Sequence, residues 1–309
     1  MSDNFYLFKE KLDQALRLIE ISSESKNKKK PMLSNDKLVD TQSLLNRCEE
    51  VCNSYQKNKP TLRIVHHLAC SGGTLISKCI SSMPNVYLLS EVHPFTDLGI
   101  DRDNPRYAPS DISSLAKYAK IPKQRELAGK IFRRSIDEAY QHVENIGGIL
   151  VLRDHTHADF NTEEAIPSIS STIDLLRRDY NVKSILTIRN PIDSYSSLVR
   201  NGWVHFKPQT FDEYCKRFFI LLGQFKQNQV FKYEDFVDCP QQQMKLMSQA
   251  LELPFDEQFE DIFGVFKITG DSGRSSDKIS PRKSLSGLND ILDNEVFERY
   301  KAIKVYSNS

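Results

Sequence analysis

From residue 61 onward, short apolar runs alternate with longer stretches in which apolar residues recur at helical spacing. Such alternation predicts a parallel β-sheet that helices cover on both faces. Strands are expected at 62–68, 86–89, 148–152, 184–188 and 230–233. Helices are expected around 75–83 and at 112–120, 124–145, 170–180, 211–225 and 240–251. The sequence therefore predicts a three-layer α/β fold with a central parallel sheet.

The segment before this domain has a different pattern. Residues 4–21 and 36–56 each place apolar side chains on one helical face, with a polar, lysine-rich linker at 22–31 between them. We therefore expect an N-terminal helical extension, residues 1–57, before an α/β domain of residues 58–309. Packing of both helices on the main domain is the expectation, and binding of a partner or of a second copy is the alternative.

The charges of the chain nearly balance, with 42 Lys and Arg against 41 Asp and Glu. A net charge of +1 predicts no general attraction to nucleic acid, so any bound anion must be held by locally placed groups. Charged residues from Asp3 to Asp13 argue against a signal peptide, and no apolar run approaches the roughly 18 residues of a membrane helix. The six cysteines show no CxxC pair and no disulfide spacing. These features predict a cytoplasmic protein.

The first predicted strand runs into a glycine turn that opens a helix. Adjacent Gly72 and Gly73 allow a tight turn that aims several backbone N–H groups at one point, and the helix N-terminus adds its positive end. Ser71 and Thr74 add hydroxyl groups on either side. This arrangement indicates a phosphate or sulfate cradle, although an ordinary strand-to-helix turn would read similarly. The GxxxxGK[ST] pattern of nucleoside triphosphatases is absent, which disfavours ATP or GTP.

A second anion site is indicated where the strand at 184–188 ends. Asn190 is a favourable N-cap and Pro191 suits a first helical turn, so Arg189 should project from the carboxyl end of the strand. Ser197 then lies about two turns into the following helix. Binding pockets of open α/β sheets form at such strand ends. A surface arginine and a small packing serine are the alternatives.

Four segments, taken in order, resemble motifs of the sulfotransferase superfamily. LACSGGTL (68–75) resembles its 5′-phosphosulfate loop, and LTIRNPIDSYSSL (186–198) resembles its 3′-phosphate motif, with the same spacing of arginine and serine. VFKYEDF (230–236) resembles a later strand whose tyrosine lies near the adenine. GRSSDK (273–278) resembles the loop that closes over the cofactor. The resemblance covers about residues 61–302 and implies a P-loop-type α/β fold.

The resemblance also implies a co-substrate, 3′-phosphoadenosine 5′-phosphosulfate (PAPS), and direct transfer of its sulfuryl group to an acceptor hydroxyl without a metal ion. The acceptor would be a carbohydrate, a small molecule or a tyrosine. Arg189 and Ser197 would hold the 3′-phosphate with help from Arg274 and Ser275, and Tyr233 would lie near the adenine or serve only in the core. The 5′-phosphosulfate would be held by the loop residues Cys70, Ser71, Gly72, Gly73 and Thr74.

Two residues are candidates for the chemistry itself. Glu91 follows the second predicted strand, and its spacing from the loop is similar to that of the glutamate base in tyrosylprotein and some bacterial carbohydrate sulfotransferases. Arg153 ends the strand at 148–152, at a position that resembles an active-site lysine of tyrosylprotein sulfotransferases. A surface acid and a surface ion pair are the alternatives. The rival bases are His66, His67, His93, His155 and His157.

Cys70 is a departure from the family pattern, because the loop usually carries Lys or Arg at this position. Arg153, Lys78 or a histidine must then supply charge to the leaving oxygen. A catalytically inactive protein that binds PAPS or its desulfated product is therefore the second hypothesis. A nucleotide kinase is the third, disfavoured by the missing lysine. A metal site is not expected, because strand alternation places His66 and His67 on opposite faces.

Overall fold

The computed structural model describes residues 46–47, 50, 59–98, 100, 103–105, 107–270, 278–281 and 291–306. The chain divides into two units, Met1–Asn58 and Lys59–Ser309. Nearly all of the predicted N-terminal helical extension lies outside the described residues, so this part of the domain organisation stays a prediction. Most of the described residues belong to the second unit.

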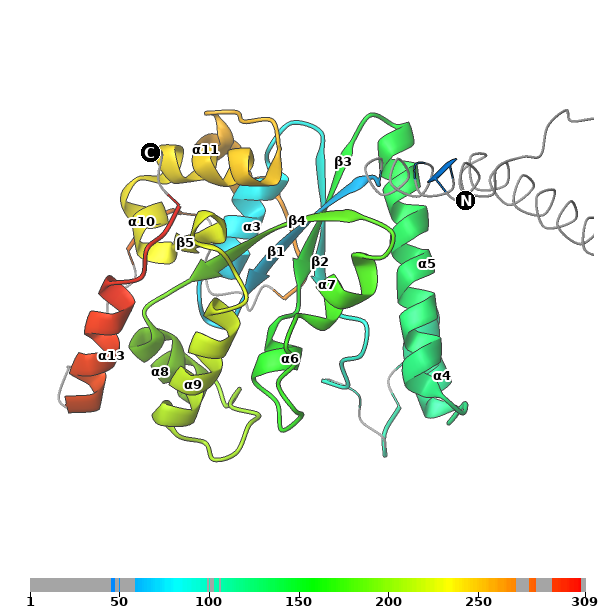
Figure 1. Ribbon diagram of the computed structural model, residues 1–309, viewed down its shortest axis with the longest axis horizontal. Helices are drawn as coiled ribbons and strands as arrows, with labels where there is room; N and C mark the ends of the chain where they lie inside the picture. Colours follow the sequence, from blue (N-terminus) through cyan, green and yellow to red (C-terminus); the bar gives the residue numbers. More distant parts are fainter. Residues whose placement is uncertain are drawn as a thin grey trace, which may run out of the picture. The chain divides into compact units, whose positions relative to one another are not determined.

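A parallel sheet forms the centre of this unit (Figure 1). Its order within the described residues is β2-β3-β1-β4-β5, and every neighbouring pair is parallel. The bounds are β1 Thr61–His67, β2 Val86–Val92, β3 Ile149–Asp154, β4 Asn181–Ile188 and β5 Val230–Lys232. The prediction of a parallel α/β fold is confirmed.

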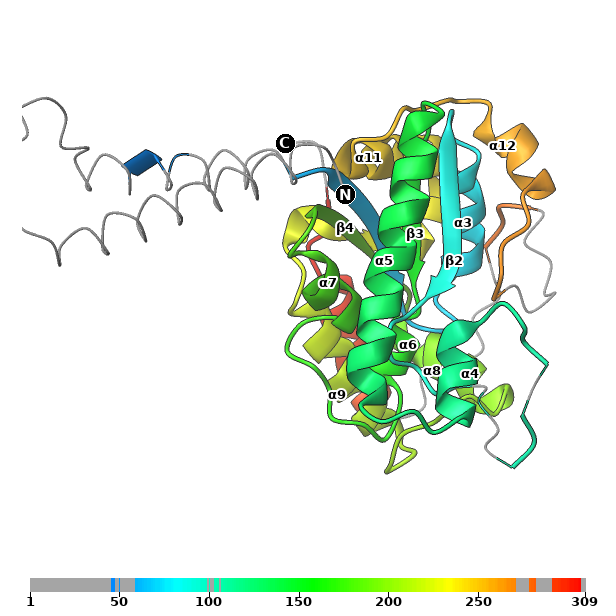
Figure 2. The ribbon, with the colours of Figure 1, turned by 90° about the vertical axis from the view of Figure 1, so that its right-hand side faces the viewer.

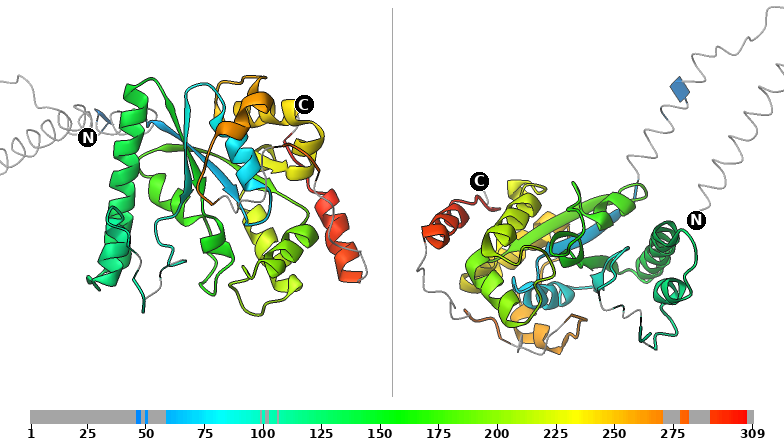
Figure 3. Two further views of the ribbon diagram at one scale, coloured as in Figure 1. Left: turned by 180° about the vertical axis from the view of Figure 1, so that it is seen from behind. Right: turned by 90° about the horizontal axis from the view of Figure 1, so that it is seen from below.

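Alternate residues of the central strands face two separate cores. Val65 of β1 packs with α3 (Gly73–Ser81) and α11 (Pro240–Leu251), whereas Ile64 packs with α5 (Gln124–Asn145) and α7 (Ser171–Leu176) on the other face. Helices therefore lie on both sides of the sheet, as Figures 2 and 3 show. Because buried strands carry apolar residues on both faces, β3 begins with the continuous apolar run 149–152.

A third core lies under β4 and β5, where Leu186, Ile188 and Val230 meet buried residues of the later helices. The remaining helices have the bounds α4 Ile112–Tyr118, α6 His157–Phe160, α8 Pro191–Arg200, α9 Phe211–Leu222, α10 Tyr233–Asp238, α12 Phe259–Ile262 and α13 Ile291–Lys301. Short 3-10 turns lie at Gln227–Gln229 and Phe263–Val265. None of the helices among the described residues is long and apolar enough to cross a membrane.

Several predicted boundaries shift by a few residues. The strand predicted at 230–233 ends at Lys232, and Tyr233 instead begins α10. The helix predicted at 170–180 is shortened to Ser171–Leu176. The strand predicted at 86–89 continues to Val92, so Glu91 lies within it. Since all strands are parallel, their carboxyl ends meet at one edge of the sheet, where the candidate site residues gather.

Candidate functional site

The loop between β1 and α3 has the backbone shape of an anion cradle. Cys70 and Gly72 both have positive φ, of 67° and 88°. The backbone N–H and the hydroxyl of Ser71 both donate to the carbonyl oxygen of Leu68, at 3.3 and 2.7 Å. No side chain caps the N-terminus of α3 and its first turn has no acidic residue, so its N–H groups and positive end face the loop. This geometry suits a phosphate or sulfate group.

Both loop glycines lie against aromatic rings. A Cβ atom on Gly72 would lie 2.2 Å from Cδ2 of Tyr233, and one on Gly73 would lie 2.0 Å from Cδ2 of His67. Tyr233 and His67 are buried, so neither ring has free space to move into. The loop therefore requires glycine at both positions, and the two rings fix its place between α10 and β1.

Arg153, at the end of β3, joins the loop to the candidate base. Its side chain is buried, and Nη2 lies 2.6 Å from Oε1 of Glu91 and donates to Oγ1 of Thr74 at 3.3 Å. Nε also donates to Nε2 of His67 at 3.0 Å. The structure thus places the guanidinium beside the N-terminus of α3, next to the place where an anion would bind.

Glu91 lies at a register shift of β2, between Ser90 and Val92. A bulge of this kind redirects a side chain at the end of a strand. Oε2 of Glu91 pairs with Nδ1 of His155 at 2.6 Å, and Oε1 faces His67 at 3.7 Å. Burial raises the pKa of Glu91, but the hydrogen bond from His155, the nearby His67 and the charge of Arg153 outweigh it, so the net pKa is well below its usual range.

His67 is buried and stays neutral near pH 7. Burial, followed by the charge of Arg153, lowers its pKa to about 4, against the opposing effect of Glu91. Its Nε2 therefore accepts from Arg153 instead of competing as a cation. Arg153 therefore contributes a positive charge, Glu91 a carboxylate and His67 a neutral imidazole to this group of side chains.

The predicted second anion site begins directly after β4. The Arg189 side chain is buried, Nη1 donates to the backbone oxygen of Cys70 at 3.3 Å, and the guanidinium carbon lies 5.5 Å from the centre of the Tyr233 ring. Asp193 lies 3.9 Å from Nη2. Asn190 caps α8 through its side chain, as predicted, and Ser197 is buried two turns further along this helix. The two cradles therefore share a wall made by Arg189 and Tyr233.

Asn201 contacts two of the predicted site residues and was not singled out from the sequence. Its Nδ2 lies 3.4 Å from Oγ of Ser197 and 3.7 Å from Sγ of Cys70, and so connects the second anion site with the loop. Its position four residues after Ser197 on the same helix was the available signal. An amide at the end of α8 has an ordinary role in capping, which is why the spacing alone did not single it out.

A separate network lies on the opposite face of the sheet. His66 pairs with Asp154 through Nδ1 and Oδ2 at 3.0 Å, and Thr172 donates to Oδ1 of the same carboxylate. Burial raises the pKa of Asp154, but His66 and its other partners outweigh this and lower it to about 2. His66 and His67 therefore belong to different networks, as strand alternation predicts. The buried pair joins β1 to β3 behind the candidate site.

The structure brings most of the predicted residues together in two groups. Glu91, Arg153 and Thr74 form one, and Cys70, Arg189 and Ser197 form the other, with Gly72 and Tyr233 between them. The predicted Arg274 and Ser275 lie outside the described residues. Among the residues that are described, no group of three or more His, Cys, Asp or Glu is placed to hold a metal ion. The binding and catalytic roles assigned to these residues remain predictions.

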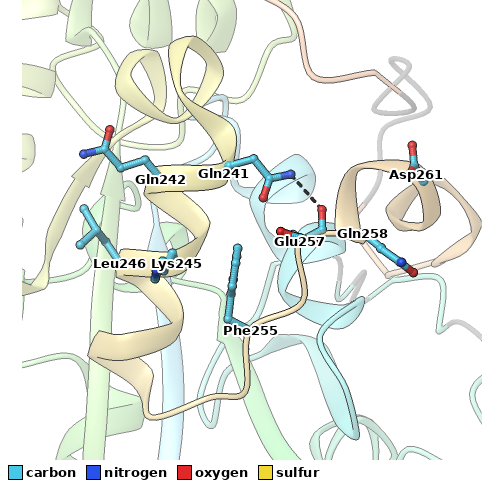
Figure 4. A pocket seen from close by; sticks show the side chains of 8 residues that line it. All are labelled: Gln241, Gln242, Lys245, Leu246, Phe255, Glu257, Gln258 and Asp261. Atoms are coloured by element: carbon cyan, nitrogen blue, oxygen red, sulfur yellow. Dashed lines mark hydrogen bonds between the residues drawn. The ribbon is translucent and has the colours of Figure 1, made fainter.

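A surface pocket lies away from these groups, on α11 and the segment that leads to α12 (Figure 4). Its walls include Lys245 and Phe255, and Gln241 donates to the backbone oxygen of Glu257 at 2.8 Å across one side. None of the predicted site residues lines it.

No protein-family model and no curated protein matches the chain. Solved structures that resemble it include the sulfotransferase domain from the curacin biosynthetic pathway, at 19% identity and a TM-score of 0.45, covering 81% of this chain and 93% of that one. The sulfotransferase domain of the Synechococcus PCC 7002 olefin synthase has 15% identity and a TM-score of 0.45, and the match covers 79% of this chain and 95% of that one. A mouse sulfotransferase complexed with PAP has 13% identity and a TM-score of 0.40, and the match covers 83% of this chain and 89% of that one. At these values the function must be argued from the site itself.

Proposed function

We propose that this protein binds PAPS and transfers its sulfuryl group to an acceptor hydroxyl. The observation that carries the proposal is the hydrogen bond from Arg189 to the backbone oxygen of Cys70, because the two proposed anion cradles would then lie side by side. A nucleotide with phosphate groups on both its 5′ and 3′ positions requires two such cradles. A nucleotide kinase needs only a 5′-phosphate cradle and normally a lysine in it, and this loop has none.

In this proposal the loop and the N-terminus of α3 hold the 5′-phosphosulfate. Arg189 and Ser197 hold the 3′-phosphate, since a guanidinium binds phosphate through two parallel hydrogen bonds. Tyr233 lies between the two cradles, where an adenosine would connect the phosphates. Asn201 supports both sites through its contacts to Cys70 and Ser197.

Arg153 is proposed to supply the positive charge that the family loop normally has at the position of Cys70. Its contact with Thr74 places the guanidinium at the loop, where negative charge would develop on the leaving phosphate oxygen. Because Arg153 is buried and fixed by Glu91 and His67, little reorganisation would be needed during transfer. Departure from the family sequence at Cys70 therefore need not remove activity.

Glu91 and His155 are proposed to act together as the base. The carboxylate of Glu91 is committed to Arg153 and His155, and its lowered pKa makes it a poor proton acceptor by itself. Its hydrogen bond to Nδ1 of His155 fixes the tautomer in which Nε2 is unprotonated. The acceptor hydroxyl would give its proton to Nε2 while its oxygen bonds to sulfur and the bond from sulfur to the phosphate oxygen breaks.

Nucleotide binding without transfer is the second candidate, favoured by Cys70 alone. A screen of melting temperature with PAPS, adenosine 3′,5′-bisphosphate (PAP), ATP and NAD tests the nucleotide, and labelled PAPS with a panel of alcohols, phenols and sugars in EDTA tests transfer. Stabilisation by PAPS and PAP alone, with label passing to an acceptor, supports the proposal. Stabilisation by ATP or NAD to the same extent contradicts it.

A further inference from the structure

Tyr300 of α13 connects the C-terminal part of the chain to the second anion cradle. α13 packs beside α8 (Figure 1), and the Tyr300 side chain is buried. Its hydroxyl donates to Oε2 of Glu234, and Oε1 of the same carboxylate accepts the backbone N–H of Asn190 at 3.0 Å. One carboxylate thus joins α13 to the residue that directly follows Arg189.

Glu234 is placed between two of the proposed nucleotide contacts. It follows Tyr233 at the start of α10, and it holds the backbone of Asn190 next to Arg189. Burial, followed by the charge of Glu234, raises the pKa of Tyr300, so the hydroxyl remains a proton donor throughout the physiological range. The Tyr300–Glu234 contact therefore fixes the strand end that carries Arg189.

α13 has other attachments that do not involve this hydroxyl. Arg299 lies over the ring of Phe219, with its guanidinium carbon 3.8 Å from the ring centre, and Lys232 donates to the backbone oxygen of Lys301 at 3.2 Å. These contacts should keep the helix docked when the hydroxyl is removed. Loss of the hydroxyl would then change how Glu234 holds the backbone of Asn190, rather than unfold this part of the chain.

We propose that Tyr300 is a positioning residue for recognition of the 3′-phosphate, acting through Glu234 on Arg189. This inference depends on the proposed function, because it assigns Arg189 to that phosphate. It predicts that removal of the Tyr300 hydroxyl weakens binding of PAP but leaves binding of AMP, which lacks the 3′-phosphate, almost unchanged.

The test compares Tyr300→Phe with Tyr180→Phe by calorimetric titration with PAP and AMP. Tyr180 is a matched control, because it is also a buried residue whose hydroxyl donates to a carboxylate, that of Asp137 at 3.0 Å, away from the site. Tyr300→Phe should weaken PAP binding about 10-fold with AMP unchanged, whereas Tyr180→Phe should change neither. On an Arg189→Ala background, Tyr300→Phe should cause no further loss of PAP affinity.

Equal weakening of PAP and AMP by Tyr300→Phe, or no weakening at all, overturns the positioning role while leaving the proposed function intact. Equal affinity of the unmodified protein for PAP and AMP instead overturns the proposed function, and the inference with it. Glu234→Gln provides a second test if Tyr300→Phe fails to fold, and it should show the same selective loss of PAP affinity. A loss shared by both nucleotides in that variant contradicts the role.

Discussion

Nη2 of Arg153 lies 2.6 Å from Oε1 of Glu91, and both side chains come from carboxyl ends of neighbouring strands. The pair compensates a buried guanidinium, whose side chain is only 3% exposed, and keeps the carboxylate ionised. The residue proposed to stabilise the leaving group and the residue proposed to support the base therefore depend on each other. Changes at either position should alter both stability and chemistry, and the variants below separate the two effects.

Glu91→Gln should lower turnover by about 10² to 10⁴, the usual contribution of a positioned base. The amide can no longer balance Arg153, so we also expect a modest loss of stability, measured by urea unfolding. PAP affinity should be nearly unchanged, because the nucleotide cradles do not include Glu91. His155→Ala should give a similar loss of turnover, and the double variant should be little worse than either single one.

Turnover of these variants is measured with the acceptor that takes label from PAPS. Effects that simply multiply in the double variant would show that Glu91 and His155 act separately. If Glu91→Gln lowered only the affinity for PAP, Glu91 would have a structural role instead of a role in proton transfer.

Gly72→Ala should abolish PAP binding and lower the free energy of unfolding by about 1–3 kcal/mol, from a strained positive φ and a clash with Tyr233. Gly147→Ala is the matched control, since Gly147 also has positive φ, of 77°, but a Cβ there would meet nothing within 4 Å. It should show the backbone strain alone and keep PAP binding. Comparable PAP affinity in the two variants would argue against a loop that binds the nucleotide.

Stability should fall as the pH is lowered from about 6.5 to 4. The pKa of His67 is lowered to about 4 in the folded protein. Between about pH 6.5 and pH 4 the unfolded chain therefore binds a proton at His67 that the folded protein does not bind. The contribution of His67 is present above pH 6.5 and amounts to about 2 kcal/mol lost between pH 7 and pH 5. His67→Gln should flatten this dependence by that amount in urea unfolding, compared with the exposed His205→Gln. An unchanged slope in His67→Gln would show that folding does not lower the pKa of His67.

Cys70→Ser should reduce turnover less than about threefold. The contact that involves Arg189 uses the backbone oxygen of Cys70, and the hydrogen bond from Asn201 to the sulfur is weak, at 3.7 Å. The proposed transfer is direct, so no thiol intermediate is required. Complete loss of activity in Cys70→Ser, together with ping-pong kinetics of the unmodified protein, would assign the cysteine a nucleophilic role.

The fold could be predicted largely from the sequence, because a buried parallel sheet leaves apolar runs such as residues 149–152 of β3. The N-cap at Asn190 was equally visible, since capping depends on local residue type. The predicted strand 230–233 includes Tyr233, whereas in the structure this residue is the first of α10. The packing of its ring against Gly72 is a tertiary contact, which the local sequence does not indicate.

The electrostatics of the site could not be read from the sequence. Glu91, His155 and Arg153 meet only because β2 lies beside β3 and shifts register at its end. The contacts of Asn201 and of Tyr300 join residues 131 and 66 positions apart in the chain, and no local pattern indicates such contacts.

Calorimetric titration of the protein with PAP and with AMP tests the central claim most directly. If Arg189 and Ser197 bind the 3′-phosphate, PAP should bind at least about 10- to 100-fold more tightly than AMP, the range expected from charge-assisted hydrogen bonds. Arg189→Ala should remove most of this difference by weakening PAP and leaving AMP almost unchanged. Equal affinity for the two nucleotides in the unmodified protein would contradict the claim that this site reads a 3′-phosphate.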